Sequence, residues 1–134
     1  TGQVDASRGG SHYDPMRDGE GFIFDVVRVE GEPTLVVYFF TYREDGSGDP
    51  AWLVGQGPIE GDSATATMVF GEGGVFGPDY DPADVSFTEW GDITVTWQTC
   101  EDVTVEYDGL WGEGSINVGR LTPTMIGATK VCAP

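Results

Sequence analysis

The segment DITVTWQTC, residues 92–100, alternates apolar and polar side chains with a period of two. Ile93, Val95 and Trp97 fall on one face, and Thr or Gln residues alternate with them on the other. Side chains of a β-strand point alternately to the two faces of its sheet, so this period predicts a strand with one buried face. The β-branched and aromatic residues that fill it favour the same structure.

Further runs rich in Val, Thr, Phe, Tyr and Trp lie on both sides of this segment, at residues 21–29, 34–42, 51–57, 64–70, 103–107 and 114–121. Gly and Pro recur between the runs and leave no room for a long helix. The run 34–42, TLVVYFFTY, is apolar on both faces, which predicts the most buried strand. Turn signals at intervals of about ten residues predict an all-β fold with a single antiparallel meander of about eight strands. A meander must close or stack to bury its apolar face, so we favour a closed or strongly curved barrel over a sandwich.

The length of 134 residues is that of one domain. Residues 1–10, TGQVDASRGG, are polar and lack periodicity, which predicts an N-terminal arm or linker before a domain over residues 11–134. The segment TYREDGSGDPAW predicts a hairpin connection, with Gly46 and Gly48 at positive φ and Pro50 at the start of the next strand. The segment GEGGVFGPDYDPAD, residues 71–84, is the one long loop.

The charge of the chain is strongly negative. It carries 23 Asp and Glu against 6 Lys and Arg, for a net charge of −17, and has no Lys or Arg between Glu44 and Gly119. This surface repels phosphate backbones and anionic lipids, so we expect neither a nucleic-acid nor a membrane partner. The apolar runs are too short to span a bilayer, and the chain begins at Thr1 as a processed protein would. We therefore expect a secreted, extracellular protein.

The two cysteines, Cys100 and Cys132, are expected to form a structural disulfide. A zinc site is the alternative, but zinc takes four ligands and the chain has one histidine. In the chain-entropy model such a bridge stabilises the fold by roughly 3–4 kcal/mol.

Five segments together resemble an uncharacterised module of proteobacterial secreted proteins: YDPMRDGEGF, FFTYREDGSGDPAWLVGQGPIEG, GGVFGPDYDPADV, WGDITVTWQTC and GEGSINVGRLT with GATKVC. The pattern of that module is Trp-Tyr-x-Pro-x-x-Ser-Gly-x-Gly, then Tyr-Thr-Tyr, Gly-x-Pro-x-Trp and Arg-Leu-Thr before a final Cys. The resemblance covers Ser11 to Cys132 and implies secretion, an all-β fold and the disulfide, but no activity. His12 and Asp18 stand where the pattern has Trp and Ser, which argues against a family-wide role for either.

The segment SHYDPMRDGEG, residues 11–21, concentrates the only histidine and three carboxylates. Asp14, Asp18 and Glu20 do not have the spacing of an EF-hand calcium loop. Pro15 is typical of a turn, and the Tyr-Asp-Pro sequence recurs at residues 80–82. We interpret the segment as a turn that leads into a strand, with its Asp capping backbone N–H groups.

No catalytic constellation is recognised, so we expect a non-catalytic protein with no catalytic residues. His12 lacks a serine in a nucleophile motif such as G-x-S-x-G and is expected at a surface or interface. Glycoside hydrolysis uses a pair of carboxylates. In a chain with so many acids, some pair will lie at a suitable distance by chance, so their abundance is no evidence of this activity.

Exposed aromatic residues are the better indication of binding. Tyr42, Trp52 and Trp111 are the candidate ligand-binding residues, because such rings suit sugars or protein partners. Trp111, in DGLWGEG, is the one we expect to be exposed. Asp79, Asp81 and Asp84 are candidate Ca²⁺ ligands, with turn formation and solubility as the alternative; no other cofactor is expected.

Three functions follow as hypotheses. The first is a secreted structural or interaction module that self-associates into an assembly or filament, its N-terminal arm adding to the sheet of a neighbour. The second is a carbohydrate-binding module for polysaccharide. The third is a protease inhibitor that presents the 71–84 loop.

Overall fold

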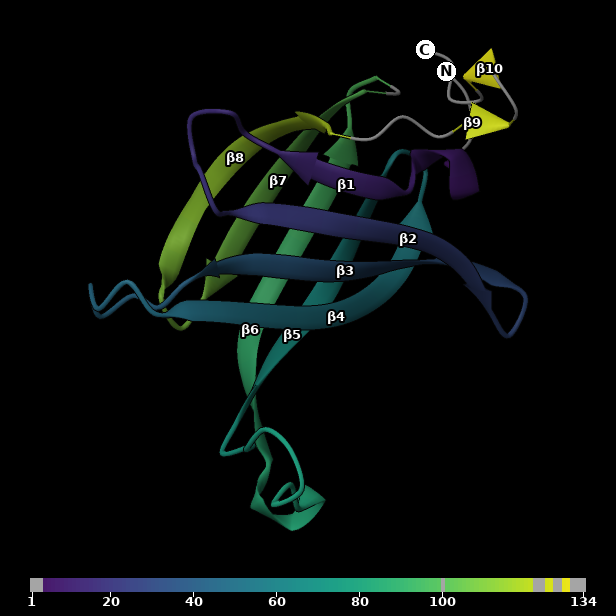
Figure 1. Cartoon of the computed structure of the whole chain (residues 1–134). Coiled ribbons are helices and arrows are strands. Elements are labelled where there is room, and N and C mark those ends of the chain that lie inside the picture. Colours follow the sequence, from purple (N-terminus) through teal and green to yellow (C-terminus); the bar gives the residue numbers. More distant parts are fainter. Residues whose placement is uncertain (1–3, 100, 122–124, 127–128, 131–134) are drawn as a thin grey trace.

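The computed structural model describes residues 4–99, 101–121, 125–126 and 129–130, and it confirms the all-β meander. Each strand pairs antiparallel with the next, and β8 returns to β1, so that the sheet closes into a ring (Figure 1). This is the barrel that the sequence favours over a sandwich. The strands of the ring are β1 Gly10–Tyr13, β2 Gly21–Val29, β3 Glu32–Tyr42, β4 Pro50–Glu60, β5 Ser63–Glu72, β6 Ser86–Trp97, β7 Asp102–Gly109 and β8 Gly112–Arg120.

Alternate residues of each strand point inward and fill the ring. Along β6, Ile93, Val95 and Trp97 are buried, as their period predicts. Phe22 stacks on Phe39 with ring centroids 4.3 Å apart, one of several aromatic contacts in the interior. The ring is therefore a packed core rather than a channel. Its buried apolar side chains are those of Val4, Phe22, Phe24, Leu35, Val37, Phe39, Leu53, Ala64, Ala66, Met68, Phe70, Trp90, Ile93, Val95, Trp97, Val103, Val105, Ile116 and Val118.

Two glycines let β4 lie close to β5. A Cβ at Gly57 would lie 1.7 Å from the carbonyl oxygen of Thr65, and a Cβ at Gly55 would lie 2.2 Å from that of Thr67. Any larger side chain would force these backbones apart, and such close approach is one use of glycine in a strand.

The N-terminal residues pack on the end of the barrel that holds the short β2–β3 and β4–β5 turns. Val4 is buried in the core, and the 3₁₀ helix η1, Ala6–Arg8, contacts β2. Arg120 donates hydrogen bonds to the carbonyl oxygens of Ser7 and Gly9, at 3.1 and 2.8 Å. The sequence predicts an arm over residues 1–10; from Val4 onward these residues lie against their own barrel.

The strand predicted to be most buried is, apart from Thr34 at its start, buried along its inner face only. Leu35, Val37 and Phe39 of β3 point inward, whereas Phe40 on the outer face is 41% exposed. The apolar outer positions of this strand lie on the surface, because the barrel has no second layer to cover them.

The β5–β6 hairpin extends well beyond the body of the barrel (Figure 1). Its loop holds the 3₁₀ helix η2, Pro82–Asp84, where the Asp81 carboxylate accepts a hydrogen bond from the Ala83 N–H at 2.9 Å. Asp14 accepts the same bond from the Met16 N–H, also at 2.9 Å. The repeated Tyr-Asp-Pro sequence is therefore a repeated turn, as predicted.

Beyond the ring, β9 Met125–Ile126 pairs with β10 Thr129–Lys130. Cys100 and Cys132 lie outside the described residues, so their disulfide stays a prediction. Among the described residues, no helix is long and apolar enough to cross a membrane.

Candidate ligand pocket at the open end of the barrel

Four connections gather at one end of the barrel because alternate connections of a meander share an end. They are residues 14–20, 43–49, 73–85 and 110–111. We call this the open end, since a pocket of about 170 Å³ lies there. The residues that line it are Arg17, Glu20, Phe39, Thr41, Tyr42, Glu44, Trp90, Tyr107, Trp111 and Ile116.

A nearly buried carboxylate forms the polar side of the pocket. The side chain of Glu20 is 9% exposed and forms an ion pair with the guanidinium of Arg17. The hydroxyl of Thr41 donates a hydrogen bond to Glu20 Oε2 at 2.7 Å. The hydrogen bond to Glu20 holds the pKa of Arg17 above its ordinary value. The ion pair and the hydrogen bond from Thr41 hold acceptor and donor atoms side by side at the pocket.

Aromatic rings form the rest of the pocket. Trp111 lies 5.2 Å from the ring of Phe70 and 6.2 Å, edge to face, from that of Trp90. The guanidinium of Arg43 stands over Trp111, 5.9 Å from its ring centroid. Tyr107 lies 6.3 Å from Trp90 on another side. These contacts hold the rings in place.

Two glycines make room for these rings. A Cβ at Gly109 would lie 2.5 Å from the ring of Trp90, and a Cβ at Gly114 would lie 2.6 Å from the hydroxyl of Tyr107. The Trp90 indole and the Tyr107 phenol therefore occupy the space that a Cβ would take at these two positions.

The floor carries a buried donor with no partner. Trp90 is 4% exposed, and within the described residues its Nε1–H makes no hydrogen bond. Buried polar groups are nearly always paired, with protein or with a bound molecule. Trp90 is one of the residues that line the pocket.

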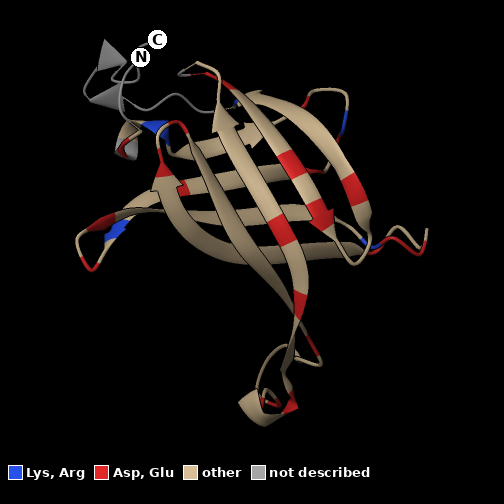
Figure 2. Ribbon diagram, turned by 180° about the vertical axis from the view of Figure 1, so that it is seen from behind, with Lys and Arg blue, Asp and Glu red and all other residues tan. Residues whose placement is uncertain are grey.

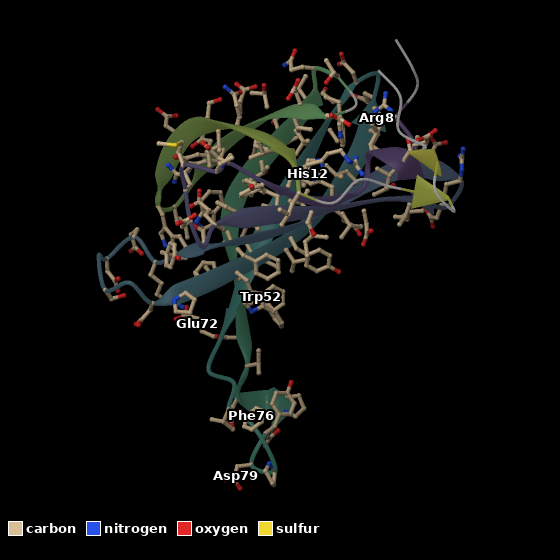
Figure 3. The ribbon with its side chains drawn as sticks, turned by 45° about the horizontal axis from the view of Figure 1, so that its top comes forward. Arg8, His12, Trp52, Glu72, Phe76 and Asp79 are labelled. Atoms are coloured by element: carbon tan, nitrogen blue, oxygen red, sulfur yellow. The ribbon has the colours of Figure 1, made fainter. Side chains whose placement is uncertain are left out.

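The three aromatic residues singled out from the sequence do not act together. Tyr42 and Trp111 both line the pocket, where the Tyr42 hydroxyl also donates to the carbonyl of Asp18 at 3.2 Å. Trp52 lies on the outer face of β4, 54% exposed, and is not among the lining residues (Figure 3). The expectation that Trp111 is exposed is wrong, because it packs against Phe70 and Trp90 and is only partly accessible.

The segment at residues 11–21 contributes more than a turn. Its turn is present, but Arg17 and Glu20 also line the pocket, which sequence reasoning missed. The expectation that His12 lies at a surface is wrong. His12 points into the barrel against Phe24, is 1% exposed, and its Nδ1 lies 2.9 Å from the Gly10 carbonyl oxygen.

The long hairpin places its candidate residues away from the pocket. Phe76 and Asp79 lie near its tip, and Phe76 is fully exposed (Figure 3). Asp79, Asp81 and Asp84 do not meet in a cluster able to hold a metal, and the described part of the chain contains no such cluster. The protease-inhibitor role of this loop stays a prediction.

No family model, curated protein or solved structure matches this chain. The resemblance to the proteobacterial secreted module stays a prediction for the same reason.

Proposed function

We propose that the chain is a secreted, non-catalytic carbohydrate-binding module that takes one neutral sugar ring in the pocket at the open end. The observation that carries this proposal is the convergence of Trp111, Tyr107 and Tyr42 with the Arg17–Glu20 pair at one opening. Aromatic rings provide contact area for the apolar face of a sugar ring. The carboxylate and guanidinium provide an acceptor and donors for neighbouring hydroxyl groups.

The dimensions of the pocket limit the ligand. A volume of about 170 Å³ lies below the range of roughly 300–1,000 Å³ that is usual for drug-sized ligands. One ring fits this space, so we expect recognition of a single residue or of a chain end. An anionic sugar is disfavoured, because Glu44 also lines the pocket and the whole chain is strongly acidic.

The test is binding to a glycan array, followed by titration of the neutral sugars that score best, with tryptophan fluorescence as the signal. Trp111→Ala should reduce affinity about tenfold or more, the effect expected of losing a central aromatic contact. Trp52→Ala is the matched control, since it removes an equally large ring outside the pocket, and it should leave affinity unchanged. Binding that survives the combined Tyr42→Ala and Trp111→Ala changes would contradict the proposal.

Self-association is a second candidate, and a specific surface favours it. The outer positions of β3 to β5 between the strand ends carry no charge: Val36, Tyr38, Phe40, Trp52, Val54, Gln56, Thr65, Thr67 and Val69. Phe40 and Trp52 are direct cross-strand neighbours there. Exposed apolar patches of this kind often mark protein interfaces. In a chain of net charge −17, two copies would repel each other less across these uncharged positions than across an acidic face.

Light scattering with calcium and with EDTA tests self-association. A mass above 14.4 kDa that rises with salt and falls on Trp52→Glu would support it, since salt screens the repulsion between acidic chains. A monomer in both buffers would contradict it.

A further inference from the structure

The seam between β8 and β1 leaves much of β8 without a second neighbour. β1 pairs with β8 only at His12 with Arg120 and at Tyr13 with Gly119. β8 extends from Gly112, and between Gly112 and Val118 it is paired with β7 alone among the described residues. In Figure 1 the tip of β1 reaches β8 partway along its length, and beyond it the β1–β2 connection, rather than a strand, passes on that side of β8.

The unpaired backbone groups of this edge can be assigned. Beyond the end of β8, the Leu121 N–H donates to the carbonyl of Ser11 at 2.8 Å, toward β1. Backbone groups of a strand alternate in direction, so the N–H and C=O groups of Glu113, Ser115 and Asn117 point to the same open side. All three residues are exposed. The edge therefore presents a row of accessible donors and acceptors, the template to which an extended chain adds.

A row of carboxylates leads to this edge. Asp92 of β6 is the direct cross-strand neighbour of Asp108 of β7, and Asp108 is that of Glu113 of β8. Like charges at directly opposed positions destabilise a sheet. Within the described residues none of the three forms an ion pair. Figure 2 shows several acidic positions, coloured red, along the strand ribbons on the side of the barrel opposite to that seen in Figure 1.

The negative charge of this row determines which kind of strand can add to the edge of β8. A second copy of the chain would place its own Glu113 and its own net charge of −17 against the edge, which Coulomb repulsion opposes. A cationic strand would instead extend the row Asp92–Asp108–Glu113 with an opposite charge. We propose that β8 adds an extended cationic peptide at its edge from Glu113 to Asn117.

The pleat of the sheet predicts the pattern of that peptide. Side chains on its outer face would lie beside Glu113 and Ser115, so Lys or Arg belongs there. Side chains on its inner face would lie beside Gly114 and the buried Ile116, so small apolar residues such as Val belong there. The expected partner is thus an extended segment in which basic and apolar residues alternate. Ile116 also lines the pocket at the open end, so these inner side chains would lie next to that pocket. The inference rests on the strand edge and its charge, not on sugar binding.

The test uses a capped synthetic peptide of alternating Lys and Val, labelled for fluorescence polarisation and titrated with the whole chain at low and at high salt. Ser115→Pro removes one donor on the open side and leaves the β7 ladder intact, because proline is tolerated at an edge position. It should weaken binding about tenfold or more, the loss expected for one missing hydrogen bond and a distorted edge. Ser115→Thr, which keeps the N–H, is the matched control and should bind like the original chain.

A second measurement guards against a variant that fails to fold. In an antiparallel pair the residues opposite Glu113 and Ser115 exchange both backbone hydrogen bonds with them, so the donors of the peptide are the N–H groups of its Lys residues. The same peptide N-methylated at its Lys residues cannot donate to the edge, and it should bind the unaltered chain about tenfold more weakly or worse. Glu113→Gln should weaken the Lys–Val peptide and reduce its salt dependence, and a Glu–Val peptide should not bind. Equal binding of the methylated peptide would show that only the acidic surface attracts it, and this would overturn strand addition. If the Lys–Val peptide does not bind, the proposal of a cationic peptide partner is overturned. It is also overturned if the chain itself forms a dimer that Ser115→Pro abolishes.

Discussion

Thr41 donates a hydrogen bond from its hydroxyl to Oε2 of Glu20, although the two residues are 21 positions apart in the chain. The bond joins the β1–β2 turn to the end of β3, and with the Arg17 ion pair it holds a nearly buried carboxylate at the pocket. A group held in this way is part of the fold as well as of the site.

Glu20→Ala should therefore lower stability as well as ligand binding. The change leaves the Thr41 hydroxyl and the Arg17 guanidinium without their acceptor, which costs about 1–3 kcal/mol for partly buried groups. Urea unfolding measures this loss. Glu113→Gln, on the exposed edge of β8, is the control and should change the free energy of unfolding by less than about 0.5 kcal/mol. Equal stabilities of the two variants would show that the contact between the turn and β3 contributes nothing.

Stability should fall on mild acidification because of His12. Its burial lowers its pKa from 6.5 to about 4, with the charge of Arg120 acting in the same direction. Between these values the unfolded chain binds a proton that the folded chain does not bind. The free energy of unfolding therefore decreases as the pH falls from about 6.5 to about 4, by roughly 3 kcal/mol in total. Above that window His12 is neutral in both states and has no effect.

The comparison that isolates this effect is His12→Gln, followed by urea unfolding across the same pH range. The carboxylates titrate alike in both proteins, so the stability difference between them reports the histidine. The variant should lose less stability than the original chain on acidification. Parallel curves would mean that His12 does not titrate between these values.

The fold could be predicted from the sequence because its signal is local. The strand at residues 92–97 follows from the alternation of Ile93, Val95 and Trp97, and the structure has this strand. The turn between β3 and β4 follows from Gly46 and Gly48, and both glycines have positive φ. Strand β1 was not predicted, since its four residues, GSHY, are too few and too polar to show a period. For the same reason the sequence predicts that His12 lies at the surface, although closure of the ring turns its side chain inward.

The candidate site could be predicted only in part because it is non-local. The sequence identifies Tyr42 and Trp111 as aromatic residues near turns, but only closure of the meander brings them to one pocket. Arg17 and Glu20 carry no binding signal of their own, since the turn explains their presence. The acidic row at Asp92, Asp108 and Glu113 can be recognised only when the register of three strands is known, and composition does not reveal that register.

Reduction of the expected Cys100–Cys132 bridge should destabilise the chain. Loss of a disulfide of this loop length costs roughly 3–4 kcal/mol in the chain-entropy model. Alkylation of the unfolded chain, followed by mass measurement, should detect no free thiol before reduction and two after it. Urea unfolding with and without reductant then gives the stability difference. Two thiols alkylated without reductant would contradict the disulfide.

Gly57 should tolerate no side chain, because its strand lies against the backbone of β5. A Cβ at this position would lie 1.7 Å from the Thr65 carbonyl oxygen, so Gly57→Ala must displace one strand from the other. Overpacking of this kind costs about 1–3 kcal/mol and occasionally more, and the displacement should lower the urea midpoint accordingly. Gly74→Ala is the matched control, since its Cβ would make an ordinary contact, 3.6 Å from Val85 Cγ2. If the two variants were equally stable, β4 and β5 would not be as close in solution as the structure places them.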